Sequence, residues 1–206
     1  MGITTEVLLR ALVEHLELTA AALALATLIG VPLGIHIARA RFLAGPVLAI
    51  VSTIQTVPSV ALLGFLIPLL GIGMKPAIVV LFSYSLLPIV RNTYTGLIGV
   101  DAAAIEAARG IGMRDGQILM RVTIPQALPV LMAGIRTATV LCVGVTTVAA
   151  LIGAGGLGSF IFRGIAMLNT TMILAGAVPA ALLALVLDLL LAGVERWITP
   201  AGLRKE

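Results

Sequence analysis

Long runs of apolar residues are the feature that most limits what this chain can fold into. Five of the runs are long enough to cross a bilayer as a helix, which takes about 20 residues. They cover residues 18–38, 43–71, 76–98, 128–152 and 172–194. Only 11% of the 206 residues are charged, against roughly a quarter in soluble domains. The sequence therefore predicts an all-α membrane protein with about five transmembrane helices, in a single domain over residues 1–206.

The second run is too long for one upright helix, because about 30 residues at 1.5 Å each exceed a hydrocarbon core of roughly 30 Å. Pro58 and Pro68 interrupt this run. Two full crossings here would separate Arg39 and Arg41, which follow the first run, from most other basic residues. We therefore expect one tilted or broken crossing.

With five crossings, most basic residues fall on one side of the membrane. They are Arg39, Arg41, Arg91, Arg109, Arg114, Arg121, Arg136, Arg196, Arg204 and Lys205. The other side holds only Arg10, Lys75 and Arg163, beside Glu6, Glu14 and Glu17. The positive-inside rule then predicts an external N-terminus and a cytoplasmic C-terminus. The same placement explains a pI near 10 without a nucleic-acid partner.

A charged, glycine-containing segment at about 100–127 separates the third and fourth runs, and the same rule places it in the cytoplasm. Asp101 can cap a short helix that Gly110 and Gly112 end, and Asp115 can cap a second that Pro125 ends. These residues alone leave two interpretations open. The segment is either a surface loop rich in arginine or a helical elbow that docks on a cytoplasmic partner.

The spacing in this segment resembles the EAA signature of the permeases of binding-protein-dependent ABC importers. Glu106-Ala107-Ala108 is followed after three residues by Gly112, and after nine more by Val122-x-Ile124-Pro125. Four further stretches are similar to permeases for osmoprotectants such as glycine betaine, choline and carnitine. They are IQTVPSVALLGFLIPLLGIG (54–73), LLPIVRNTYTGL (86–97), AGIRTATVL (133–141) and AALIGAGGLG (149–158).

The resemblance implies a type I (MetI-like) ABC importer permease fold, in the cytoplasmic (inner) membrane of a bacterium or archaeon. It makes the central segment the coupling helices, which insert into a groove on the ATPase subunit. The residues it assigns to coupling are Glu106, Ala107, Ala108, Gly112, Asp115, Ile124 and Pro125. Relatives often carry Thr or Ser at the position of Arg114, so we expect Asp115 to cap the second helix instead.

The partners implied are a cytoplasmic ABC ATPase dimer, a second permease subunit that is identical or different, and an extracytoplasmic solute-binding protein, all at a lipid bilayer. ATP and Mg would be bound by the ATPase, because the sequence has no GxxxxGK[ST] phosphate loop. We expect no metal or cofactor in this chain. Aromatic residues make up 4% of it and form no evident cage for a quaternary ammonium group, so selection is expected in the binding protein.

Two places are candidates for the translocation pathway. A break at Pro58 would free backbone groups that only protein or water can satisfy in a membrane, which favours the middle of the second run. The candidates there are Gln55, Thr56, Pro58 and Ser59, with Tyr84 of the third run as a weaker one. A glycine-rich turn after the fourth run is either a close-packed turn or, by the resemblance, part of an external gate. Its glycines are Gly153, Gly155, Gly156 and Gly158.

Asp188 lies inside the last run, where a carboxylate is costly. We expect it to pair with a basic residue such as Arg136 in a structural role rather than to carry protons or bind substrate. The glycines of Gly30-x-x-x-Gly34 predict a close helix approach.

Two rival functions remain on sequence grounds. A gradient-driven carrier or channel would also be polytopic, but it would not need an elbow of this spacing. A membrane-embedded enzyme is disfavoured because His15 and His36 lie at opposite ends of the first run, Cys142 has no evident base, and HExxH and GxSxG motifs are absent.

Overall fold

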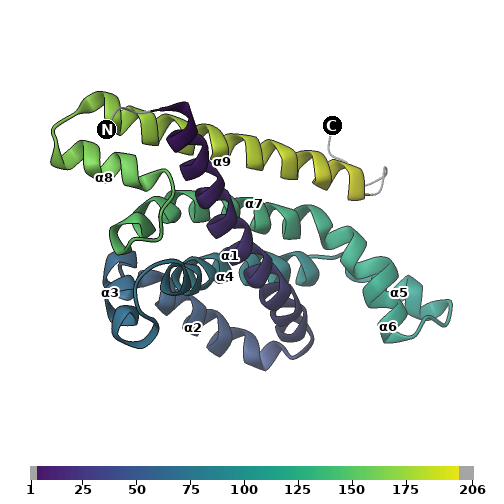
Figure 1. Ribbon diagram of the computed structural model, residues 1–206. Coiled ribbons are helices and arrows are strands. Elements are labelled where there is room, and N and C mark those ends of the chain that lie inside the picture. The colour runs from purple at the N-terminus through teal and green to yellow at the C-terminus, as the bar shows by residue number, and fades with distance from the viewer. Residues whose placement is uncertain (1–3, 200–206) are drawn as a thin grey trace.

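The computed structural model describes residues 4–199, and it folds them into a bundle of helices (Figure 1). The α-helices are α1 (Thr5–Arg39), α2 (Ala44–Thr56), α3 (Ser59–Leu70), α4 (Met74–Ile98), α5 (Ala102–Gly110), α6 (Asp115–Ile118), α7 (Ile124–Ala149), α8 (Gly158–Ala166) and α9 (Thr170–Ile198). Three short turns complete the fold: η1 (Arg41–Leu43), a π turn η2 (Leu119–Thr123) and η3 (Ala150–Ile152). The predicted all-α class is confirmed.

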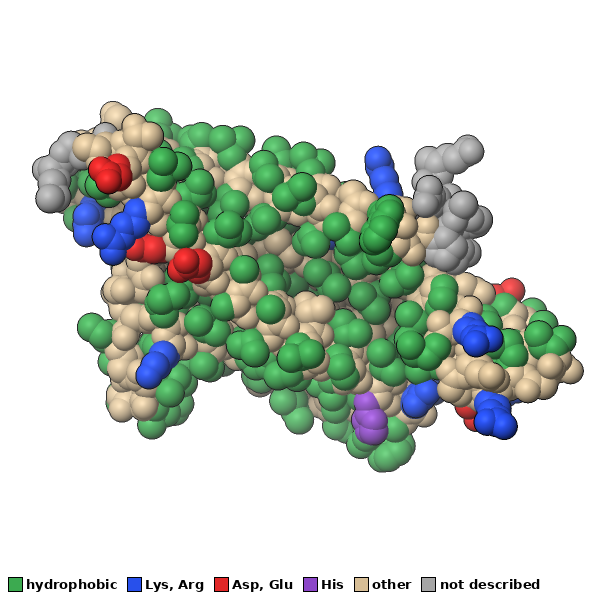
Figure 2. All heavy atoms as spheres, turned by 45° about the vertical axis from the view of Figure 1, so that its right-hand side comes forward, with side chains coloured by type: hydrophobic (Ala, Val, Ile, Leu, Met, Phe, Trp, Pro, Cys, Tyr) green, Lys and Arg blue, Asp and Glu red, His purple; other side chains and the backbone are tan. Residues whose placement is uncertain are grey.

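Within residues 4–199, four helical stretches are long and apolar enough to cross a membrane: α1, α4, the continuous stretch Asp115–Ile152 and α9. The fifth candidate is the pair formed by Arg41–Thr56 and Ser59–Leu70, which is bent by 93°. Figure 2 shows hydrophobic side chains over the middle of the molecule and most charged ones towards its two ends. The structure thus agrees with about five spans.

The bend lies at Val57 and Pro58, as the sequence predicts. Val57 is extended (φ −70°, ψ 129°), because a residue before proline is disfavoured in the helical region. Pro68, expected to interrupt the run as well, instead lies inside α3. That expectation was wrong, since Pro68 falls near the end of a helix that stops two residues later.

The bent pair connects opposite ends of the molecule, so it is one broken crossing. Arg41, at its start, lines the same cavity as Arg109 and Asp115 of the central segment. Gly73, just after its end, donates its N–H to the carbonyl oxygen of Ile152 at 2.9 Å, beyond the other end of α7. Arg39, Arg41 and the arginines of the central segment therefore share one end, as expected. Arg204 and Lys205 lie outside the described residues.

Helix α4 is the centre of the bundle, packed between α1 and α7 (Figure 1). Glycine residues on α1 and α7 allow each of these helices to approach α4 closely. A Cβ added to Gly34 of α1 would lie 2.6 Å from the Cβ of Thr93, and one added to Gly134 of α7 would lie 2.5 Å from the Cβ of Asn92. The predicted close approach at Gly30 and Gly34 is confirmed. Close backbone contact at small residues is a main source of helix association in membranes.

The contact at Gly134 gives the first testable prediction. We expect Gly134→Ala to lower the free energy of unfolding by about 1–3 kcal/mol through overpacking. The added Cβ would lie 2.7 Å from the backbone oxygen of Pro88, an atom that cannot rotate away. Unfolding in detergent followed by circular dichroism measures the effect. Gly144→Ala on the same helix is the control, because a Cβ there meets nothing within 4 Å. Equal losses in the two variants would contradict the prediction.

Candidate coupling element and translocation pathway

Helix α5 begins and ends where its sequence dictates. Asp101 is its N-cap, and the carboxylate accepts the N–H of Ala103 at 2.9 Å, as predicted. After the helix ends, Gly112 has φ +81°, and the N–H of Met113 donates to the oxygen of Ala108 at 3.1 Å. This is the geometry of a Schellman motif, which favours glycine at the left-handed position. A sharp elbow follows between α5 and α6.

The start of α6 differs from the prediction. Its N-cap is Arg114, not Asp115, which is the first helical residue. The Arg114 N–H donates to Oε1 of Gln117 at 2.9 Å, and this bond stabilises the helix start although the arginine side chain has no acceptor. The carboxylate of Asp115 lies 3.6 Å from the guanidinium of Arg109, with both side chains exposed.

Pro125 does not end a second helix, which corrects another expectation. The π turn η2 runs directly into α7, and Pro125 lies in the first turn of that helix. Proline is tolerated in the first turn of a helix, where its missing N–H has no helical partner to lose. The elbow is therefore the tip of a continuous helical stretch, Asp115–Ile152.

The residues assigned to coupling divide into two groups. Glu106, Ala107, Gly112 and Asp115 are exposed on the elbow, whereas Ala108 is buried and Ile124 and Pro125 are half-buried below it. Two further residues of this segment, Ile111 and Met120, were not expected from the sequence to be exposed there, and they are 80% and 64% exposed. Their signal is a large apolar side chain within a polar segment. Both residues lie in the same segment as the exposed carboxylates of Glu106 and Asp115.

The structure brings two pathway candidates together at the broken crossing. The side-chain amide of Gln55 donates to the backbone oxygen of Tyr84 at 3.4 Å, and the Tyr84 hydroxyl donates to the oxygen of Val57. Tyr84 thereby satisfies a carbonyl freed by the bend, as a membrane requires. Pro58 is exposed and Ser59 is half-buried at the start of α3. Thr56 instead bonds within its own helix, to the oxygen of Thr53.

The glycine-rich turn is close-packed against α1. Gly153, Gly155 and Gly156 have φ between +76° and +83°. The N–H of Gly156 donates to Oε2 of Glu14 at 3.0 Å, and the Glu14 carboxylate also pairs with Arg10. A Cβ on Gly158 would overlap the backbone oxygen of Thr147. These contacts hold the turn firmly at the end of α7, and the gate function remains a prediction.

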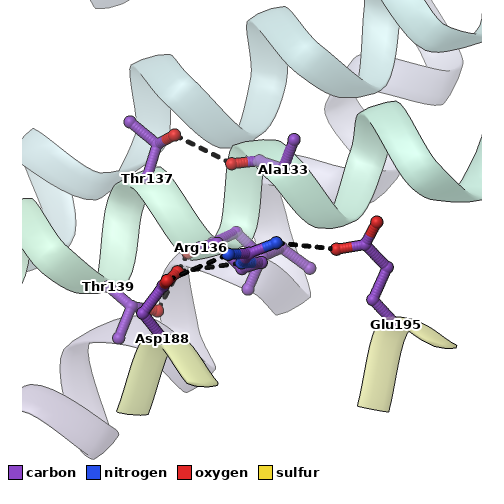
Figure 3. A network of polar contacts seen from close by, with 7 residues as sticks. Ala133, Arg136, Thr137, Thr139, Asp188 and Glu195 are labelled. Carbon is purple, nitrogen blue, oxygen red and sulfur yellow. Dashed lines mark hydrogen bonds and ion pairs between the residues drawn. The ribbon is translucent and has the colours of Figure 1, made fainter. Parts of the chain in front are cut away.

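An ion-pair network joins α7 to α9 (Figure 3). Arg136 donates through Nε and one terminal nitrogen to both oxygens of Asp188, at 2.8 and 2.9 Å, and through the other to Glu195 at 3.1 Å. The predicted pairing of Asp188 with Arg136 is confirmed. The bidentate geometry is among the strongest that these groups form, and it neutralises charges within otherwise apolar spans.

The network gives a prediction about its charges. We expect Asp188→Leu to destabilise the protein by about 1–3 kcal/mol, because the bonds to the guanidinium are lost. The triple variant Arg136→Met, Asp188→Leu and Glu195→Gln should recover part of that loss, because it leaves neither an unpaired arginine nor the carboxylate that Arg136 binds at 3.1 Å. Unfolding in detergent measures both variants. A triple variant less stable than Asp188→Leu alone would contradict the expectation.

Comparisons with known proteins agree with this architecture. Residues 30–201 match the family described as binding-protein-dependent transport system inner membrane component. The choline transport system permease protein OpuBB of Bacillus subtilis is 48% identical over 192 residues, covering 93% of this chain and 88% of the relative. The osmoprotectant import permease protein OsmW of Salmonella typhimurium is 50% identical over 196 residues, covering 93% and 91%.

The fold is also similar to a solved structure. An inward-facing structure of the MetNI methionine ABC transporter matches with a TM-score of 0.85 and 27% identity, over 95% of this chain and 98% of that one. This agreement confirms the expected MetI-like permease fold. The chain belongs to the family of inner membrane components of binding-protein-dependent transport systems.

Proposed function

We propose that this chain is the membrane-spanning subunit of an ATP-driven importer for osmoprotectants of the quaternary-ammonium class, such as choline, glycine betaine or carnitine. Family membership supports the transport function, and the names of two relatives, a choline permease and an osmoprotectant permease, support the substrate class. The observation that carries the proposal is the elbow formed by α5 and α6, which projects from one end of the bundle (Figure 1).

The elbow would be the docking element for an ATPase dimer that binds ATP and Mg. Ile111 and Met120 present apolar surface, and Glu106 offers an exposed carboxylate that makes no hydrogen bond or ion pair with a described residue. Because α6, η2 and α7 follow one another without a gap, a displacement of the elbow would move α7 with it. Such a lever would convert closure of the ATPase dimer into reorientation of the spans.

The complete importer would contain two permease subunits, one for each ATPase, and an extracytoplasmic binding protein that delivers the solute. The clustering of arginines around the elbow supports a cytoplasmic location for this end and an external N-terminus. ATP binding would draw the two elbows together and open the pathway outward, and hydrolysis would reset the inward-facing state.

The pathway would run beside the broken crossing and have low affinity for the solute. The aromatic residue placed there, Tyr84, already uses its hydroxyl to bond Val57. Tyr84 by itself does not make the aromatic cage that binds quaternary ammonium groups tightly, and aromatic residues make up only 4% of the chain. This supports selection by the binding protein rather than by the permease.

Uptake by the reconstituted importer tests the substrate class. The permease, its ATPase and its binding protein are placed in liposomes, and entry of radiolabelled choline is followed with and without internal ATP. We expect ATP-dependent uptake that unlabelled glycine betaine or carnitine reduces and methionine does not. Uptake driven by an ion gradient without ATP would contradict the importer proposal and favour a carrier. ATP-dependent methionine uptake alone would contradict the substrate class.

Gly112 tests the coupling element. Valine is strained at φ +81° because its branched side chain meets the backbone there. We expect Gly112→Val to leave the protein inserted but to lower uptake about tenfold relative to ATP hydrolysis, as a strain of 1–2 kcal/mol deforms the elbow. Gly110→Val is the control, since Gly110 ends α5 without a positive φ and a Cβ there meets nothing. Normal coupling in Gly112→Val would overturn the role assigned to this turn.

A further inference from the structure

A cavity of about 690 Å³ lies where the elbow meets the ends of α1 and α4. Its wall comes from three parts of the chain: the last turn of α1 with η1, the last turn of α4, and the central segment from α5 to the π turn. Of the residues assigned to coupling only Asp115 lines it, and none of the pathway candidates does.

The cavity carries an excess of positive charge. Three arginines line it, Arg39, Arg41 and Arg109, against one carboxylate, that of Asp115. Asp115 already lies 3.6 Å from Arg109. Arg39 and Arg41 are exposed and form no ion pair with any residue between 4 and 199. Two positive charges on α1 and η1 are therefore left to attract an anion.

Most of the rest of the wall is apolar, with Thr123 as the exception. Ile35, Leu97, Ile105 and Ile118 contribute hydrocarbon beside the guanidinium groups. Phe42 follows Arg41 in the chain and is 80% exposed. The last turns of two membrane-spanning helices form part of the wall, which puts the cavity near the border between hydrocarbon and headgroups. A ligand that fits must be anionic at one end and apolar at the other.

We propose that this cavity binds an anionic phospholipid. The phosphate would lie between Arg39 and Arg41, whose planar guanidinium groups suit phosphate oxygens, and the start of an acyl chain would lie on the apolar wall. Basic pockets between membrane helices are known to bind such headgroups. Free phosphate would leave the apolar wall without a contact. An acidic protein segment as the ligand would not explain why the cavity opens beside the ends of membrane spans.

The site would bridge two separate parts of the permease. Arg39 and Arg41 belong to the corner after α1, whereas Arg109 and Ile105 belong to the elbow. One bound lipid would bridge them, so the resting position of the elbow would depend on the anionic lipid content of the membrane. Binding itself does not depend on the transported solute, and it can be measured on the permease alone.

Quenching by brominated lipids tests the proposal. Trp197, the one tryptophan of the chain, is replaced by Phe, and Ile98→Trp provides a reporter on the cavity wall. The full chain is placed in phosphatidylcholine nanodiscs with equal fractions of brominated phosphatidylglycerol or brominated phosphatidylcholine. We expect the cavity to prefer phosphatidylglycerol over phosphatidylcholine, as measured by quenching of the tryptophan introduced at position 98, by about fivefold for each of the two arginines, Arg39 and Arg41.

The matched variants identify the source of the preference. Arg39→Gln with Arg41→Gln should abolish it, and the Lys pair at the same positions should retain part of it. Lys75→Gln with Arg163→Gln, at the opposite end of the molecule, should leave it unchanged. Equal quenching by both lipids in the parent protein, or no quenching by either, would overturn the proposal. Displacement of the brominated lipid by inorganic phosphate at constant ionic strength would show that the anion alone is bound, and would also overturn it.

Discussion

The close contact of α4 with α1 and α7 is the constraint on which the rest of the structure depends. Lipid tails are as apolar as leucine, so apolar burial does little to drive these helices together inside a membrane. Backbone approach at Gly34 and Gly134 supplies dense packing instead. Helices α1, α4 and α7 thus form the core of the bundle. The broken crossing packs on α4, and α9 packs on α7.

Satisfaction of polar groups at membrane depth is the second constraint. The bend at Pro58 frees a carbonyl, and Tyr84 from the central helix bonds it. The carboxylate of Asp188 would be costly in hydrocarbon, and Arg136 neutralises it with two hydrogen bonds. In both cases the partner comes from a helix that the small-residue packing has already positioned. Polar irregularities are thus possible here only because the packing around them is rigid.

Features that depend on residues close together in the chain could be predicted from the sequence more completely than features that depend on distant segments. The spans, the bend at Pro58 and the cap at Asp101 depend on neighbouring residues, and all of them could be predicted. Asp188 and Arg136 could be paired because few charges lie at that depth, whereas Glu195 completed the network without being foreseen. The end of α6 could not be read from Pro125, because the π turn Leu119–Thr123 joins α6 to α7, and Pro125 lies in the first turn of α7. The cavity beside Arg39 required three distant segments and had no sequence signal.

The continuity of one helical stretch joins the two ends of the molecule mechanically. Residues Asp115–Ile152 run 38 residues from the elbow to the far end, a length of about 57 Å at 1.5 Å per residue. There, the oxygen of Ile152 accepts the N–H of Gly73 at the end of the broken crossing, and the turn after it is bonded to Glu14 of α1. A rotation of the elbow would therefore reach the second crossing through a backbone hydrogen bond and the first helix through the side chain of Glu14. In the proposed importer, this stretch would carry a movement of the elbow to the glycine-rich turn at the opposite end.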